Sequence, residues 1–149
     1  MVGKFYEDFS VGDTQEFGNY TVEKEEIIAY GKKYDPQPFH TNEDAAEESA
    51  FGGLIASGLL TAGIGQRMLV ENFIHGSRAR GSLGIDNLRW RHPVRPGDTL
   101  SMKTEIVEKE IWNDDYGIVS VSIEIRNQEG EIAASLIGLI RYERREERE

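Results

Sequence analysis

The sequence predicts an α+β protein in which a curved antiparallel β-sheet wraps around one central apolar α-helix. Three observations favour this class. Residues 54–73 form an apolar segment long enough for a buried helix, the second half of the chain alternates between apolar and polar residues, and the helical patterns precede the run of strands. A sheet with one apolar face needs a covering layer, and the apolar helix supplies it.

Length and composition narrow the class further. The chain has 149 residues, which fits a single domain spanning 1–149 with a charged tail at about 142–149. It has 17 Lys and Arg against 27 Asp and Glu, and this net charge of −10 argues against a nucleic-acid surface covering the whole protein. Since there is no cysteine, disulfides and thiolate chemistry are excluded. No membrane span or secretion signal stands out, so we expect a cytoplasmic protein without membrane or nucleic-acid partners.

The first third of the chain predicts a strand, a helix and a loop. The strand is expected at 14–20, and Thr21 is placed to cap a helix that ends near Gly31. Two prolines, at 36 and 38, follow this helix and predict a stiff irregular loop, because each fixes its own backbone and keeps the residue before it out of the helical region.

A second capping pattern and the apolar segment predict two further helices. Thr41 begins an [ST]-x-x-[DE] pattern, which predicts a short helix through about Ser49. The segment 54–73 is nearly apolar all round at its start, as expected of a buried helix. A glycine in a helix costs about 1 kcal/mol relative to alanine, so the glycines at 58, 63 and 65 call for close approach of a sheet or a ligand.

The second half of the chain is expected to be β-structure. Strands are predicted at 80–91, 99–111, 117–127 and 132–140. Strict alternation in 117–127 predicts one buried and one solvated face, and the composition of 127–130 predicts a hairpin turn. The strand 132–140 carries apolar residues on both faces, which favours a central or dimer-forming position.

The clearest candidate for chemistry is the pair Asp35 and His40. A carboxylate and an imidazole in a prolyl-stiffened loop suit acid–base work, because one group can accept a proton while the other donates. The two side chains converge only if the loop bends. In the structural alternative, Asp35 only accepts a hydrogen bond in a turn or a helix cap, and His40 is a loop histidine whose hydrogen bonds are made within the protein.

Ser57 and Gly58 stand at the head of the apolar helix. Such a position offers free backbone N–H groups and the positive end of the helix dipole, which is the equipment of an oxyanion hole. The structural alternative is that Ser57 is only an N-cap and Gly58 only a packing glycine.

Five arginines fall within one strand region of an otherwise acidic chain. They are Arg78, Arg80, Arg89, Arg91 and Arg95. Guanidinium groups match phosphate oxygens, so this region could hold a phosphorylated ligand, or it could be a solvated strand face paired with glutamates. We expect His75 and His92 to be structural or exposed. We predict no metal site, because such a site needs at least three converging ligands and the sequence does not identify three.

Two segments, YDPQPFHT at 34–41 and FGGLIASG at 51–58, resemble the hydratase motif of the MaoC-like dehydratases, a family related to the (R)-specific enoyl-CoA hydratases. Residues 84–90 and 93–98 resemble that family's first long strand and the turn after it, so the resemblance covers about residues 4–141. It implies a hotdog fold in which two subunits join their sheets and the site lies between subunits.

The resemblance also implies a reaction, the reversible hydration of an enoyl-CoA thioester. Asp35 and His40 would hold the water that adds to the β-carbon and share the proton transfer to the α-carbon, while the Gly58 N–H would receive the thioester oxygen. The other substrate-binding candidates are Ser57, Gln37, Arg89 and Arg95. Coenzyme A would enter as part of the substrate with no separate cofactor, and the protein would be a homodimer or a larger homo-oligomer.

Two alternatives remain open from the sequence. A thioesterase on the same fold commonly carries a carboxylate on or near the central helix, whereas here the early turns of that helix have none and Glu71 lies at its far end. A non-catalytic acyl-CoA-binding protein is the other, because Gln37 stands where the usual Asp-x-Asn-Pro-x-His motif has asparagine.

Overall fold

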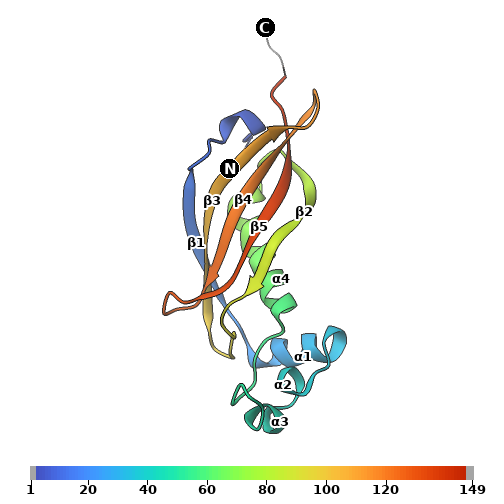
Figure 1. Cartoon of the computed structure of the whole chain (residues 1–149), viewed down its shortest axis with the longest axis vertical. Coiled ribbons are helices and arrows are strands. Elements are labelled where there is room, and N and C mark those ends of the chain that lie inside the picture. The colour runs from blue at the N-terminus through green and yellow to red at the C-terminus, as the bar shows by residue number, and fades with distance from the viewer. Residues whose placement is uncertain (1–2, 147–149) are drawn as a thin grey trace.

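The computed structural model describes residues 3–146. A five-stranded antiparallel sheet with the strand order β1-β3-β4-β5-β2 curves around helix α4 (Figure 1). The strands are β1 (Thr14–Thr21), β2 (Ala79–Trp90), β3 (Thr99–Ile111), β4 (Tyr116–Arg126) and β5 (Ile132–Glu143). The helices are α1 (Lys24–Tyr34), α2 (Pro38–Thr41), α3 (Glu43–Glu47) and α4 (Gly58–Leu69), with short turns at Tyr6–Asp8 and Val70–Ile74. This arrangement confirms the predicted fold class.

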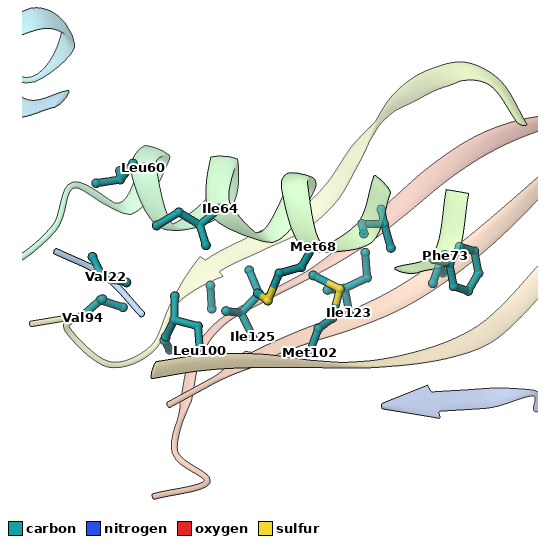
Figure 2. Packing of buried hydrophobic residues seen from close by; sticks show 14 of the residues in the cluster. Val22, Leu60, Ile64, Met68, Phe73, Val94, Leu100, Met102, Ile123 and Ile125 are labelled. Atoms are coloured by element: carbon teal, nitrogen blue, oxygen red, sulfur yellow. The ribbon is translucent and has the colours of Figure 1, made fainter. Parts of the chain in front are cut away.

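The core lies between α4 and the concave face of the sheet. The odd-numbered apolar residues of β4 at 119–125 are all buried, as the alternation predicts. Figure 2 shows Ile64 and Met68 of α4 pointing toward Ile125 and neighbouring sheet residues. Since this packing orients α4 against the sheet, it also fixes where the first turn of the helix lies.

Two of the three helix glycines have the expected close neighbour. A Cβ at Gly65 would lie 2.5 Å from Ile125 Cδ1, and one at Gly58 would lie 2.4 Å from Trp90 Cε2. Nothing lies within 4 Å of the corresponding position at Gly63, so the sheet does not approach the helix there. The sheet approaches α4 at one glycine, and the end of β2 approaches it at the other.

Several helix boundaries differ from the prediction. Thr21 is the last residue of β1 and does not cap α1, whose N-cap is Glu23. Helix α1 continues past the expected end to Tyr34, and Asp35 N still donates to Gly31 O. Helix α3 is capped by Asn42, whose side chain accepts a hydrogen bond from the first turn.

The segment after α1 is only partly irregular. Pro38 begins helix α2, because proline is well suited to the first helical turn, and His40 lies within this helix. Thr41 is the last residue of α2 rather than a cap, and its hydroxyl donates to Gln37 O at 3.0 Å. This turn folds the segment back on itself, which a straight path between the prolines would not do.

The apolar helix begins later than expected. Residues 54–57 are not helical, because Ile55 N donates to Phe39 O and Ala56 N donates to Val94 O. These bonds tie the approach to α4 to both α2 and the segment after β2. Helix α4 therefore starts at Gly58, next to the expected helix head.

At the other end of the chain, β5 lies between β4 and β2, the interior position predicted for it. The charged tail begins later than 142, because Tyr142 is fully buried within β5. Positions 147–149 of that tail lie outside the described residues. Over residues 3–146, none of the helices combines the length and apolar character that crossing a membrane requires. The single-domain assignment and the cytoplasmic location stay predictions.

Candidate active site

Three segments meet at the end of the sheet where α4 begins (Figure 1). Asp35 directly follows α1, His40 lies in α2, and Ser57 directly precedes α4. Hydrogen bonds among these side chains and the adjoining backbone hold the segments together.

The loop does bend so that the two predicted groups meet. Asp35 Oδ2 lies 3.4 Å from His40 Nε2. The His40 side chain is 6% exposed and that of Asp35 is 25% exposed, so the carboxylate reaches solvent while the ring is enclosed. The helical turn of α2 produces this meeting, which five residues of extended chain would prevent.

The backbone sets the tautomer of the histidine. His40 Nδ1 lies 2.8 Å from Ile55 O, and a carbonyl oxygen can only accept, so Nδ1 carries the proton. In the neutral ring Nε2 is therefore a bare acceptor that faces the Asp35 carboxylate. Two acceptors do not bond each other, and the pair is arranged to share a donor between them.

The carboxylate is held by two donors. Gln37 Nε2 donates to Asp35 Oδ1 at 2.7 Å, and Ser57 Oγ donates to Asp35 Oδ2 at 2.8 Å. These bonds, that of Gln37 first and that of Ser57 second, lower the pKa of Asp35 from its ordinary value, and a positive charge on His40 would lower it further. Asp35 is thus an ionised acceptor over the physiological pH range. The Gln37 amide bonds directly to the carboxylate. The Ser57 hydroxyl bonds to Asp35 and does not cap the backbone of α4.

The pair opens onto a cavity of about 370 Å³. Its walls are mainly apolar, and its polar groups lie at the Asp35–His40 end and at the end of β2. The cavity is lined by, among others, Asp35, His40, Phe51, Gly58, Trp90, Arg91 and His92. As the first residue of α4, Gly58 carries one of the N–H groups that a helix leaves without a partner in its own backbone. The same cavity is therefore lined by the two acceptors and by the residue that begins α4.

The arginines predicted to bind substrate lie outside this cavity lining. Arg95 Nη2 donates to Phe51 O at 2.6 Å and so steadies a wall of the cavity. Arg89 lies on β2 and donates to its neighbour Leu88 O. The substrate-binding roles of Arg89, Arg95, Ser57, Gln37 and Gly58 stay predictions.

Trp90, Arg91 and His92 line the cavity. Of these, only Arg91 is expected from the sequence to lie near a ligand, as one of the five arginines that could hold a phosphorylated group, whereas Trp90 has no predicted role and His92 is expected to be structural or exposed. Trp90 is opposite the fully buried Ala134 in the register, a pairing that only the folded sheet reveals. His92 also pairs with Glu131, their closest atoms being 3.2 Å apart. Within residues 3–146, no cluster of three or more His, Asp or Glu side chains is suited to hold a metal ion.

The Ser57 hydrogen bond predicts a pH effect. If Asp35 must be ionised, the activity of the protein falls as the pH drops through the pKa of Asp35. This pKa is depressed in the wild type. Ser57→Ala removes one stabilising donor, so the pKa of Asp35 rises and the acidic limb of the kcat/KM profile moves to higher pH. The profile of kcat/KM against pH checks this. A limb that stays in place while kcat falls at every pH would contradict it, and Ser49→Ala, which removes a hydroxyl bonded to Ala46 O, is the control.

Comparison with known proteins gives consistent matches. The family model described as "MaoC like domain" matches residues 8–127. The (R)-specific enoyl-CoA hydratase of Rhodospirillum rubrum is 31% identical over 104 residues, which cover 68% of this chain and 68% of that protein. An uncharacterized Bacillus subtilis protein, YdeM, is 27% identical over 122 residues, covering 82% of this chain and 86% of its own.

A solved structure is similar over almost the full length. The crystal structure of the MaoC-like dehydratase from Rhodospirillum rubrum superimposes with a TM-score of 0.87 at 36% sequence identity, and the alignment covers 97% of this chain and all of that chain.

Proposed function

Because the chain belongs to the MaoC-like domain family, we propose that it catalyses the reversible hydration of an enoyl-CoA thioester, a lyase reaction, with Asp35 and His40 at its centre. The matches confirm the family resemblance and the hotdog fold expected from the sequence. The observation that carries the proposal is the facing pair of acceptors, 3.4 Å apart, on a cavity that Gly58, the first residue of α4, also lines.

The pair of acceptors is suited to bind the attacking water. One water molecule has two hydrogens, and it can donate one to Asp35 Oδ2 and the other to His40 Nε2. This arrangement orients the water oxygen's lone pairs away from both acceptors and toward the cavity.

The pair also handles the proton. As the water oxygen bonds to the β-carbon, its proton passes to His40 Nε2, and the ionised Asp35 stabilises the imidazolium that forms. The imidazolium then returns a proton to the α-carbon, so the net change is OH on the β-carbon and H on the α-carbon. Acid–base assistance of this kind is worth about 10²–10⁴ in rate.

The Gly58 N–H supplies the third requirement. Addition at the β-carbon moves negative charge onto the thioester oxygen, and a donor at the positive end of α4 stabilises it. A single donor of this kind contributes about 10²–10³ in rate. With the base, the acid and the oxyanion donor supplied by the chain, we propose that no cofactor besides the coenzyme A of the substrate takes part.

The R configuration is part of the proposal. Its support is the similarity to the Rhodospirillum rubrum protein named as an (R)-specific enoyl-CoA hydratase. Chiral analysis of the 3-hydroxybutyryl-CoA formed checks it, and an S product would contradict this part of the proposal alone.

The test of the function is direct. Purified protein with crotonyl-CoA should remove the enoyl absorbance and form 3-hydroxybutyryl-CoA without free thiol. Release of thiol from saturated butyryl-CoA without hydration would instead indicate a thioesterase. Binding of crotonyl-CoA without turnover, unchanged by His40→Gln, would indicate a non-catalytic acyl-CoA-binding protein. Either result would reject the proposed function.

We propose in addition a homodimer that forms through β2. This strand is at the edge of the sheet, so one side of its backbone has no strand partner within the described part of the chain. Leu83, Ile85 and Trp90 on it are each about half exposed. Two such edges can join antiparallel about a twofold axis, which pairs the open backbone groups and covers the apolar side chains.

A charge on this edge should disrupt the dimer. Ile85→Glu places two carboxylates near the twofold axis of the joined strands, so we expect monomers by light scattering and a large loss of hydration. The control is Val11→Glu, which adds the same charge at a residue that is 62% exposed before β1 and should leave the dimer intact. A wild-type monomer, or an Ile85→Glu dimer as stable as the wild type, would contradict this assembly.

A further inference from the structure

The structure separates the five arginines of residues 78–95 by what each guanidinium binds. Arg80 Nε lies 2.7 Å from Glu143 Oε2, and Arg78 pairs with the same carboxylate. Arg95 is engaged with the carbonyl of Phe51. Arg89 and Arg91 are exposed, and neither forms an ion pair with a carboxylate within residues 3–146.

Both arginines without an ion pair neighbour one residue of β5, although only the Arg91 side chain bonds to it. Arg91 Nε donates to Ser135 Oγ at 2.7 Å, and Arg89 is the register partner of Ser135. The other neighbour of Ser135 in the sheet is Glu124, whose charge is already paired with Arg126. Arg89 and Arg91 are two residues apart and share a face of the sheet, so an anion that both contact would offset the repulsion between their charges.

Arg91 lines the reaction cavity, and Arg89 lies two residues before it on the face of β2 opposite to Trp90. Trp90, between the two arginines in sequence, packs on Gly58 at the head of α4, and both Trp90 and Arg91 line the cavity. Figure 1 shows the end of β2 next to the start of α4. A thioester seated at Gly58 therefore has Arg91 in the wall of its binding site, with Arg89 next to Arg91 on the same strand face.

We propose that Arg89 and Arg91, with Ser135 positioning Arg91, form a subsite for phosphate groups of the substrate's coenzyme A. This inference rests on the proposed function and selects these two arginines for the phosphate contact. In a chain with a net charge of −10, a polyanionic substrate is repelled on average, and a local positive pair at the cavity edge offsets this. One guanidinium group can donate to two phosphate oxygens at once, and this explains why arginine suits both positions.

The test uses substrates that differ only in their phosphates. Crotonyl-CoA, crotonyl-3′-dephospho-CoA and crotonyl-pantetheine are compared with the wild type, Arg89→Gln and Arg91→Gln. For crotonyl-CoA we expect each substitution to raise KM about 5-fold with kcat unchanged, as for an exposed charged contact. For crotonyl-pantetheine, which has no phosphate, we expect no change.

The control is Arg80→Gln, which removes the same charge at the other end of β2 and should leave every KM unchanged. Arg91→Lys should recover part of the loss, and Ser135→Ala should cause a smaller rise in KM than Arg91→Gln. If the substitutions leave the KM for crotonyl-3′-dephospho-CoA unchanged, the contact is to the 3′-phosphate. If they still raise this KM, the contact is to the diphosphate. Both results support the subsite.

Three results would overturn the inference. They are an unchanged KM for crotonyl-CoA in both variants, an equal loss with crotonyl-pantetheine, and an equal loss in Arg80→Gln. Titration calorimetry with 3′,5′-ADP and with free coenzyme A separates this inference from the proposed function. Tight binding that weakens in Arg91→Gln supports the subsite even without turnover, while wild-type protein that hydrates crotonyl-CoA but binds neither nucleotide overturns the subsite alone.

Discussion

Replacement of His40 by glutamine should lower kcat/KM for crotonyl-CoA hydration by about 10²–10⁴-fold, the range for loss of a positioned acid–base group. Glutamine has no nitrogen that can take a proton from the water and return it to the α-carbon. Asp35→Asn should lower kcat/KM by a similar factor. The amide nitrogen can neither accept a hydrogen bond from the water nor stabilise an imidazolium. Steady-state kinetics measure both effects.

The two substitutions should also be non-additive. Because Asp35 and His40 act on one water, the double variant should be little worse than the poorer single variant. His92→Gln is the matched control, since it replaces another histidine of the cavity wall and should keep most of the activity. Thermal unfolding should show each variant folded. Activity within about threefold of wild type in a folded Asp35→Asn or His40→Gln variant would contradict the assigned roles.

Addition of one methyl group at Gly58 should lower kcat by about 10²–10³-fold, the magnitude for loss of an oxyanion donor. A Cβ there would lie 2.4 Å from Trp90 Cε2, so either the indole or the first turn of α4 must move. Either movement displaces the N–H from the position that the thioester oxygen needs. Kinetics with crotonyl-CoA, together with the fluorescence of the tryptophans, measure the loss and the displacement.

A second substitution tests the cause of that loss. Trp90→Leu should make room for the new methyl group, so the double variant Gly58→Ala with Trp90→Leu should recover part of the kcat lost in Gly58→Ala. Gly63→Ala is the control, because nothing lies within 4 Å of a Cβ at that helix position. Full activity in Gly58→Ala would show that the helix head has no catalytic role.

The strands could be predicted from the sequence because their signal is local. Alternation along 117–127 depends only on which residues face the core, and β4 occupies nearly the same range. The start of α4 could not be predicted in this way. Residues 54–57 are as apolar as the helix, but Ile55 and Ala56 bond to Phe39 and Val94, which are distant in the sequence.

The candidate site shows the same division. Residue types and order pointed to Asp35, His40 and Gly58, but the meeting of the first two depends on the turn of α2 and on the carbonyl of Ile55. Trp90 was overlooked because its importance comes from contact with Gly58, far away in the chain. The arginines could be recognised as a group, whereas their ion pairs became visible only in the folded protein.

The central claim is that Asp35 and His40 jointly hold the oxygen that adds to the β-carbon while the helix head binds the thioester oxygen. A crystal structure of the protein with bound 3-hydroxybutyryl-CoA tests this without any substitution. We expect the product hydroxyl within hydrogen-bond distance, about 2.5–3.2 Å, of both Asp35 Oδ2 and His40 Nε2, and the thioester oxygen at a similar distance from Gly58 N. A product whose hydroxyl contacts neither side chain, or whose thioester lies away from α4, would contradict it.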